Sequence, residues 1–303
     1  MPKNTDATFT RMDGVKEYAL RLAASGWIPG RWFNSALPEK TALRAAQRPL
    51  TLEVVSHCWK YSEFQLYQLS SLVNHAPTQL KVIHTVFYSD EDADTVRLLD
   101  FFRTQQVANV TWNFIALPKE QLFRRAIGRN QAAKQTQADW IWFTDCDVVF
   151  HEGALDTLAT QLEGCQEFLV YPQQMLATDL LPKDDPLIVQ AKANPTVMEL
   201  DLTRFSVRKF SRATGPIQIA HGDAARACGY CDSLAVYQKP MTRWSKCYED
   251  RAFRWLLGTQ GVPIEVPNVL FIRHAEKGRY QQGSQISVLR KTIRRMKSAL
   301  FNR

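Results

Sequence analysis

An alternation between strand-like and helix-like segments extends from residue 51 to residue 145 and limits the possible folds more than any other feature. Four runs are apolar and rich in β-branched or aromatic residues, and apolar residues at helical spacing fill the segments between them. The strand-like runs span 52–58, 80–89, 110–117 and 139–145, and the helical segments span 61–75, 91–106 and 119–137. This pattern predicts an α/β fold with a mostly parallel sheet flanked by helices.

The pattern is looser after residue 150. Helices are predicted near 153–163 and 250–258, and strands near 167–172 and 267–274. A long stretch that contains prolines, from 176 to 216, lies between them. We expect this half to be an antiparallel addition that closes over the site, with the 176–216 stretch partly mobile.

The composition is that of an ordinary globular protein, 45% hydrophobic and 22% charged over 303 residues. No linker composition or repeat period divides the chain, so we expect one domain over 51–280, with an N-terminal helical lead (1–50) and a C-terminal tail (281–303). The first residues lack the apolar core of a signal peptide, and the six cysteines are scattered. A cytoplasmic protein with reduced thiols is therefore predicted.

The tail carries a large share of the formal net charge of +8. In "LRKTIRRMKSALFNR", the apolar residues Leu289, Ile293, Met296 and Leu300 share one helical face between basic residues. Such a helix suits an anionic membrane surface, which would make the protein peripheral at the inner membrane face. A terminal helix that docks on its own domain is the alternative. Nucleic acid is an unlikely partner, because no nucleic-acid module accompanies the charge.

Two acids, Asp145 and Asp147, lie at the end of the fourth strand-like run in "WIWFTDCDVVF". Ligands of parallel sheets bind beyond the carboxyl ends of the strands, which places both acids at the ligand rim. Mn²⁺ and Mg²⁺ prefer carboxylate oxygens and commonly share them with substrate phosphates. The pair is therefore predicted to bind Mn²⁺ or Mg²⁺ together with a diphosphate, although one such acid alone could cap the next helix.

With these segments in order, the region from about 51 to 275 resembles the nucleotide-sugar-dependent glycosyltransferases of the GT-A fold, and is most similar to the inverting enzymes of family 2. The resemblance rests on "LEVVSHCWKYSEFQLYQLSSL", "VFYSDED", "GRNQAAKQTQADWIWFTDCD" and "YEDRAFRW", in this order and spacing. It implies that 51–150 binds the nucleotide sugar and that 151–280 binds the acceptor.

The resemblance also implies roles for residues of the first half. Asp147, with help from Asp145, would hold the metal on the donor diphosphate. Asp90 would bind the nucleoside, and Arg129, in the Arg129–Asn130 pair of the motif, would approach the base or the phosphates.

Other predicted contacts lie at the two ends of the domain. Ser56 and His57 are candidate nucleotide contacts, in a loop, "SHCWKYS", that departs from the usual family pattern. His274, after the last predicted strand, is similar to a histidine that some GT-A enzymes use as a metal ligand. Lys277 and Arg279 are candidate phosphate contacts.

In "KCYEDRAF", Glu249 and Asp250 match the family position of the catalytic base, and Asp250 is the preferred candidate. The alternative is an acid-rich helix start. Asp223, in "AHGDAARACGY", is a candidate for sugar recognition. The predicted reaction is transfer of a sugar from a nucleoside diphosphate, with UDP expected, to a hydroxyl of a glycan or lipid-linked acceptor, with inversion.

Three other readings fit parts of the sequence. "FTDCDVV" also fits the opening motif of haloacid-dehalogenase phosphatases, in which Asp145 would be the nucleophile. Cys228 and Cys231, with Cys247 and His221, are spaced as a zinc site could be. A non-catalytic module that binds sugar nucleotides is the third reading.

Overall fold

The computed structural model describes residues 9–34, 36–243 and 248–275 of the chain. Within these residues the predicted alternation is present. Its elements are β1 (Leu50–His57), α2 (Ser62–Asn74), β2 (Leu80–Tyr88), α3 (Ala93–Arg103), β3 (Val110–Ala116) and β4 (Trp140–Phe143). All four residues of β4 are buried, as expected for a strand covered on both faces.

The segment predicted as one helix over 119–137 is divided into α4 (Lys119–Leu122) and α5 (Arg125–Gln135). Arg124 lies at the break with non-helical dihedral angles, φ −103° and ψ 86°. Its fully buried guanidinium lies between the rings of Phe9 and Tyr237, 4.9 and 5.7 Å from their centres. Periodicity within the segment could not reveal this break, because the groups that hold Arg124 come from distant parts of the chain.

The main sheet has the strand order β10-β6-β9-β4-β1-β2-β3. Its further strands are β6 (Leu169–Pro172), β9 (Gln218–His221) and β10 (Val262–Ile264). All neighbouring pairs are parallel except those of β9, which runs antiparallel to both β4 and β6. The prediction of a mostly parallel sheet is thus confirmed, and β4 is its central strand.

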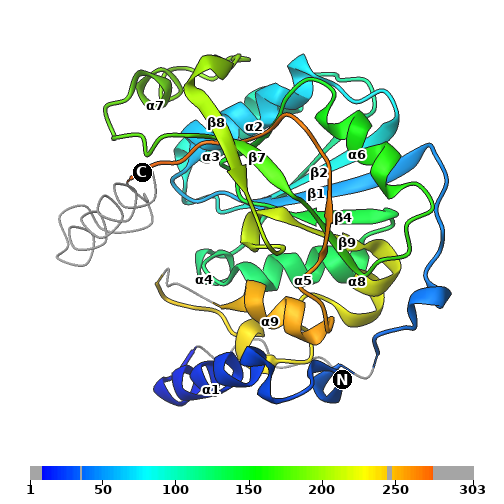
Figure 1. Ribbon diagram of the computed structural model, residues 1–303. Helices are drawn as coiled ribbons and strands as arrows, with labels where there is room; N and C mark the ends of the chain where they lie inside the picture. Colours follow the sequence, from blue (N-terminus) through cyan, green and yellow to red (C-terminus); the bar gives the residue numbers. More distant parts are fainter. Residues whose placement is uncertain (1–8, 35, 244–247, 276–303) are drawn as a thin grey trace.

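A second sheet has the order β5-β11-β7-β8. Its strands are β5 (Val148–Phe150), β7 (Gln174–Thr178), β8 (Phe205–Lys209) and β11 (Val269–Phe271). The outer pairs are antiparallel, but β7 and β11 pair in parallel. In Figure 1, β7 and β8 pass in front of the main sheet. The 176–216 stretch, expected to be partly mobile, contains β8 and the short helix α7 (Pro186–Gln190).

Helices cover both faces of the main sheet (Figure 1). The remaining ones are α1 (Arg11–Leu22), α6 (Ala154–Leu162), α8 (Gly222–Cys228) and α9 (Glu249–Leu256). α2, α3 and α6 lie on one side of the sheet, and α5, α8 and α9 on the other (Figure 1). Trp140 and Trp142 of β4 are completely buried between these layers, and a buried side chain of this kind stabilises the fold by roughly 1.5–3 kcal/mol.

The described part of the N-terminal lead packs against α9 (Figure 1). α1 begins with a capping box between Thr10 and Asp13, and the buried Asp13 forms an ion pair with Lys239 at 2.9 Å. None of the helices in the described ranges is both long and apolar enough to cross a bilayer. The predicted amphipathic tail, 281–303, lies outside the described residues.

Candidate active site

The turn that carries the two acids joins the main sheet to the second sheet. β4 ends at Phe143, and Val148, the first residue of β5, donates its N–H to the carbonyl of Asp145 at 3.2 Å. Gln68 of α2 closes the turn, since its Nε2 donates to the carbonyls of Asp145 and Val148 at 3.0 and 2.7 Å. A side chain of the neighbouring helix therefore fixes the backbone of the acidic turn.

Gln68 is itself held by a buried polar network. Its Oε1 accepts a hydrogen bond from Gln65 Nε2 at 3.0 Å and lies 3.1 Å from His84 Nε2. Burial lowers the pKa of His84 to about 3, so the ring is neutral near pH 7 and can donate from Nε2. The sequence prediction missed these residues. Their signal is a pair of glutamines three positions apart on a helix that is buried along most of its length.

Asp145 faces two arginines of α5. Arg125 Nη1 lies 2.6 Å from Asp145 Oδ1, and Arg129 Nη2 lies 3.5 Å from the same oxygen. Arg129 is fully buried, and its Nη1 donates to the hydroxyl of Tyr230 at 2.9 Å. Arg125 was not predicted. The signal that could have found it is its position four residues before Arg129, which puts both on one helical face.

Asp147 faces a different neighbour. His274 Nε2 lies 3.5 Å from Asp147 Oδ2, and both side chains are almost fully buried. The His274 ring stacks on Phe64 with centres 4.1 Å apart, which fixes its orientation. The carbonyl of Asp147 accepts the N–H of Ile272, just past β11. Asp147 and His274, two of the predicted metal ligands, are thus brought together, while Asp145 pairs with α5.

A carboxylate and an imidazole held this close fit a divalent cation. A small cation bound at about 2.1 Å keeps adjacent octahedral ligands about 3 Å apart, so the 3.5 Å separation of Asp147 Oδ2 and His274 Nε2 needs little adjustment. Mn²⁺ accepts carboxylate ligands readily and leaves positions for phosphate oxygens. Asp147 and His274 are accordingly the side chains that could hold such an ion.

The acid pair at the start of α9, Glu249 and Asp250, contacts Arg125 through Glu249. Arg125 Nε is 3.5 Å from Glu249 Oε1, so one guanidinium connects Glu249 with Asp145. Glu249 is buried and Asp250 is partly exposed. The carboxylate of Asp250 faces the backbone of Gly215, where a Cβ atom would lie 3.6 Å from Asp250 Oδ2. α9 therefore presents one buried and one accessible acid beside the turn.

Residues 21–28 of the N-terminal lead contact α9 and the residue just before it. Trp255 Nε1 donates to the carbonyl of Ile28 at 2.6 Å, and Arg251 Nη2 donates to Ser25 Oγ at 2.7 Å. Just before the helix, the ring of Tyr248 packs under the guanidinium of Arg21, 4.2 Å from the ring centre. Residues before β1 thus help to set the position of the two acids.

The other predicted contacts lie apart from this arrangement. Asp90 is exposed at the end of β2. Asn130 Nδ2 donates to Asp232 Oδ1, and Asn130 Oδ1 accepts the N–H of Tyr230. Asp223 accepts the N–H of Arg44 at 2.8 Å. Lys277 and Arg279 lie outside the described residues.

The two candidates from β1, Ser56 and His57, are buried. Ser56 Oγ donates to Gln65 Oε1 at 3.2 Å, and the His57 ring stacks on Phe87 with centres 5.0 Å apart. The pKa of His57 is lowered mainly by burial and further by the nearby Arg129 and Arg125. In this arrangement neither side chain is exposed to a ligand.

The proposed zinc cysteines do not form a metal cluster within the described part of the chain. Cys228 and Cys231 are buried, and Cys231 Sγ donates to the carbonyl of Glu249 at 3.4 Å. His221 Nε2 lies 3.0 Å from the carbonyl of Arg44. Cys247, the remaining member of the predicted set, lies outside the described residues.

A cavity of about 570 Å³ lies next to His274. It is bounded by the first turns of α2 and α3 and by the 181–195 segment. Its charged and titratable lining combines basic residues and acids in equal number with one histidine: Lys60, Arg97, Lys183, Lys192, Glu63, Glu91, Asp92, Asp94 and His274. A polar substrate could contact both this lining and, at His274, the acidic turn.

Comparison with known proteins finds a family match for the segment that contains the acidic turn. Residues 70–179 match the family model described as Glycosyl transferase family 2, about a third of the chain, and this region includes Asp145 and Asp147. This segment, which includes strands of the mostly parallel sheet, is therefore similar to the glycosyltransferases of family 2. The acid pair therefore lies in a segment that matches a glycosyltransferase family, and this match opposes the phosphatase reading.

A crystal structure of S. aureus TarS 1-349 is similar to 75% of this chain, with 13% sequence identity and a TM-score of 0.40. The similar region covers 61% of that chain, so this protein spans only about three fifths of it. None of the proteins with curated descriptions matches the sequence significantly.

Proposed function

We propose that this glycosyltransferase requires Mn²⁺ or Mg²⁺ and transfers a sugar from a nucleoside diphosphate, with UDP the expected nucleotide, to a hydroxyl group of a glycan or lipid-linked acceptor. The transfer proceeds with inversion at the anomeric carbon. The observation that supports this proposal most directly is the position of Arg125 between Asp145 and Glu249, because it joins the acidic turn to the acid pair of α9.

The donor side of the proposal rests on the acidic turn. Asp147 and His274 would hold the cation, which would stabilise the charge that develops on the departing nucleoside diphosphate. Arg125 and Arg129 supply positive charge on the α5 side of the turn, where phosphate oxygens can compete for the contacts now made by Asp145. The cavity beside His274 is wide enough to receive part of a substrate.

The acceptor side rests on α9. Asp250 is the proposed general base, because its side chain is partly exposed and its carboxylate lies beside Gly215, which has no side chain to cover it. It takes the proton of the acceptor hydroxyl while the hydroxyl oxygen attacks the anomeric carbon and the bond to the diphosphate breaks. The buried Glu249 acts differently: it pairs with Arg125 and keeps that side chain in position.

A screen of nucleotide sugars for release of nucleoside diphosphate, with and without Mn²⁺, tests the donor side. Wild-type protein should release nucleoside diphosphate only with the cation, and UDP with Mn²⁺ should raise its Tm. Asp147→Asn should lose both responses. The control is Asp100→Asn, an exposed acid on α3 that pairs only locally with Arg103, and it should keep both. The donor proposal fails if Asp147→Asn still responds like the wild type.

Asp250→Asn tests the base. It should retain the Tm shift with UDP and Mn²⁺ but lose roughly 10²–10⁴-fold in transfer rate, because only the proton acceptor is removed. Loss of donor binding in this variant, or transfer at the wild-type rate, would remove Asp250 from the base role. Product stereochemistry, read by NMR of the new glycosidic bond, tests inversion separately.

We also propose that the basic tail attaches the enzyme to an anionic membrane surface, where a lipid-linked acceptor would be found. The proposal is supported by the amphipathic pattern of 281–303. Removal of residues 287–303 should abolish sedimentation with anionic liposomes and leave release of nucleoside diphosphate unchanged. Equal sedimentation of the full and shortened chains would exclude this role for the tail.

A further inference from the structure

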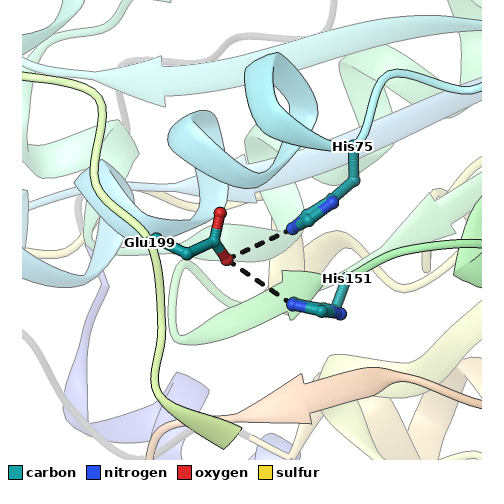
Figure 2. A group of neighbouring side chains, drawn as sticks. All are labelled: His75, His151 and Glu199. Carbon is teal, nitrogen blue, oxygen red and sulfur yellow. Dashed lines mark hydrogen bonds and ion pairs between the residues drawn. The ribbon is translucent and has the colours of Figure 1, made fainter.

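Two histidines and a glutamate from three separate segments meet on the surface, away from the acidic turn (Figure 2). His75 follows the last residue of α2, His151 follows β5, and Glu199 belongs to the segment between α7 and β8. Their ligand atoms all lie within 4.8 Å of one another. Among the described residues, this is the group of three or more histidine, cysteine and acidic side chains that is close enough to share a metal ion.

The geometry of the three side chains suits a transition metal. Glu199 Oε1 lies 3.3 Å from His75 Nε2 and 3.5 Å from His151 Nε2, and Figure 2 shows both imidazoles directed at this one oxygen. Zinc binds nitrogen and oxygen at about 2.0–2.1 Å, so neighbouring ligands of a tetrahedral site lie about 3.3–3.4 Å apart. The two separations from Glu199 Oε1 already match that spacing, and the two histidines contribute ligand atoms within 4.8 Å of each other.

Contacts with the backbone and a neighbouring side chain fix the carboxylate. Asn74 Nδ2 donates to Glu199 Oε2 at 2.8 Å. The other carboxylate oxygen, Oε1, is the one that faces the two histidines. The N–H of Leu200 donates to Glu199 Oε1 at 3.2 Å. The pKa of His151 is lowered, first by burial and then by the nearby His75, which favours the neutral imidazole that binds metals. The three ligands are thus arranged before any ion arrives.

We propose that His75, His151 and Glu199 form a binding site for a divalent transition-metal ion, with Zn²⁺ as the preferred ion. Two imidazoles and one carboxylate are a zinc ligand set, and a water completes the coordination from the solvent side, where the Glu199 side chain is 57% exposed. This site is distinct from that of Asp147 and His274.

The proposed ion would attach the segment between α7 and β8, which contains Glu199, to the ends of α2 and β5. The same connection already contacts α2, since Ser70 Oγ accepts the N–H of Met198 at 3.0 Å and Asn74 Nδ2 donates to the Met198 carbonyl at 3.1 Å. The neighbouring 181–195 residues line the cavity beside His274. A metal at Glu199 would therefore strengthen the attachment of the segment that forms one wall of the cavity.

Competition for Zn²⁺ with a chromogenic chelator tests the site. The experiment uses an Asp147→Asn background, so that the acidic turn contributes little, and should give one tight site per chain. His151→Ala and Glu199→Gln should each weaken the affinity at least about tenfold. The matched control is Glu152→Gln, an exposed acid next to His151 that is not a member of the group, and its affinity should be unchanged.

Co²⁺ provides a second measurement. Co²⁺ bound by nitrogen and oxygen ligands should give visible absorption bands without the intense near-ultraviolet band of cobalt–thiolate bonds, and His151→Ala should remove the visible bands. Zn²⁺ should also slow hydrogen exchange in residues 196–201 of the control but not of Glu199→Gln. Wild-type affinity in both ligand variants, or a thiolate band, would overturn the proposal and assign the ion to the cysteines. Tm values without metal verify that each variant is folded.

Discussion

Arg125 Nη1 lies 2.6 Å from Asp145 Oδ1, and the same guanidinium reaches Glu249 with its Nε at 3.5 Å. The contact joins the first acid of the acidic turn to the helix that carries the proposed base. Both side chains of the close pair are partly accessible, 20% for Arg125 and 30% for Asp145, so a ligand can reach them. The arginine is therefore in a position to align the donor and acceptor sides of the site.

A double-mutant cycle with Arg125→Gln and Asp145→Asn should measure this contact. We expect the two single changes to lower the free energy of unfolding by amounts whose sum exceeds the loss in the double variant by about 1 kcal/mol, as for coupled neighbours. Urea denaturation provides the free energies. Arg97 and Asp94, an exposed pair 3.0 Å apart on α3, form the control cycle and should couple by less than about 0.5 kcal/mol. Additive effects at Arg125 and Asp145 would show that the contact is weak in solution.

Arg125→Gln should also lower kcat/KM for sugar transfer by about a hundredfold, because misplacement of the diphosphate by even a small distance slows the reaction. Arg97→Gln should change it by less, since Arg97 lines the cavity beside His274 and pairs with Asp94 of its own helix. Steady-state kinetics with the donor found in the screen would measure both. Unchanged kcat/KM in Arg125→Gln would limit this residue to a structural role.

Gln68→Leu should destabilise the acidic turn. The variant removes the two hydrogen bonds that Gln68 Nε2 donates to the carbonyls of Asp145 and Val148. It also leaves His84 without the acceptor Gln68 Oε1. A buried polar group left without a partner costs about 1–3 kcal/mol. We expect a loss of about 2–4 kcal/mol in the free energy of unfolding. Gln137→Leu, at an exposed position before β4, should change stability by no more than about 0.5 kcal/mol. Similar losses in both variants would contradict the role of Gln68.

Acid should destabilise the fold through His84. Burial lowers the pKa of His84 from 6.5 to about 3 in the folded chain, so the unfolded chain binds more protons between these values. This contribution to stability is fully present above pH 6.5 and falls with decreasing pH until about pH 3, at about 1.4 kcal/mol per pH unit in the middle of the range. In His84→Gln, which keeps an amide donor toward Gln68, the slope of unfolding free energy against pH should be smaller by up to one proton. An equal slope in wild type and variant between pH 4 and 6 would exclude His84 as the source.

Two glycines should respond oppositely to alanine. A Cβ atom on Gly128 of α5 would lie 2.4 Å from His57 Nε2 and 2.9 Å from the ring of Phe87, so Gly128→Ala should cost about 1–3 kcal/mol. Gly14 lies inside α1, where a Cβ atom would meet nothing closer than Phe9 at 4.0 Å. Gly14→Ala should therefore stabilise the protein by about 0.5–1 kcal/mol, because alanine favours the helix. The Tm of each variant, compared with that of the wild type, shows whether the substitution stabilises or destabilises the protein.

The sequence by itself determined much of the fold. Periodicity in the first half is a local property, and it located β1, α2, β2, α3, β3 and β4 within a few residues. Ligands of parallel sheets bind beyond the carboxyl ends of the strands. The same pattern therefore predicted that Asp145 and Asp147 lie at the carboxyl end of β4. These predictions succeeded because each depends on residues that are close in the chain.

The tertiary structure decided how distant residues meet. It placed Arg125 between Asp145 and Glu249, buried Ser56 and His57, divided the 119–137 helix at Arg124 and brought His75 and His151 to one oxygen of Glu199. None of these contacts has a periodic signal, because each depends on the register of separate elements and on the packing of side chains between them. The local pattern determined which elements form and where the acids follow them, while the packing of those elements selected the partners of each acid.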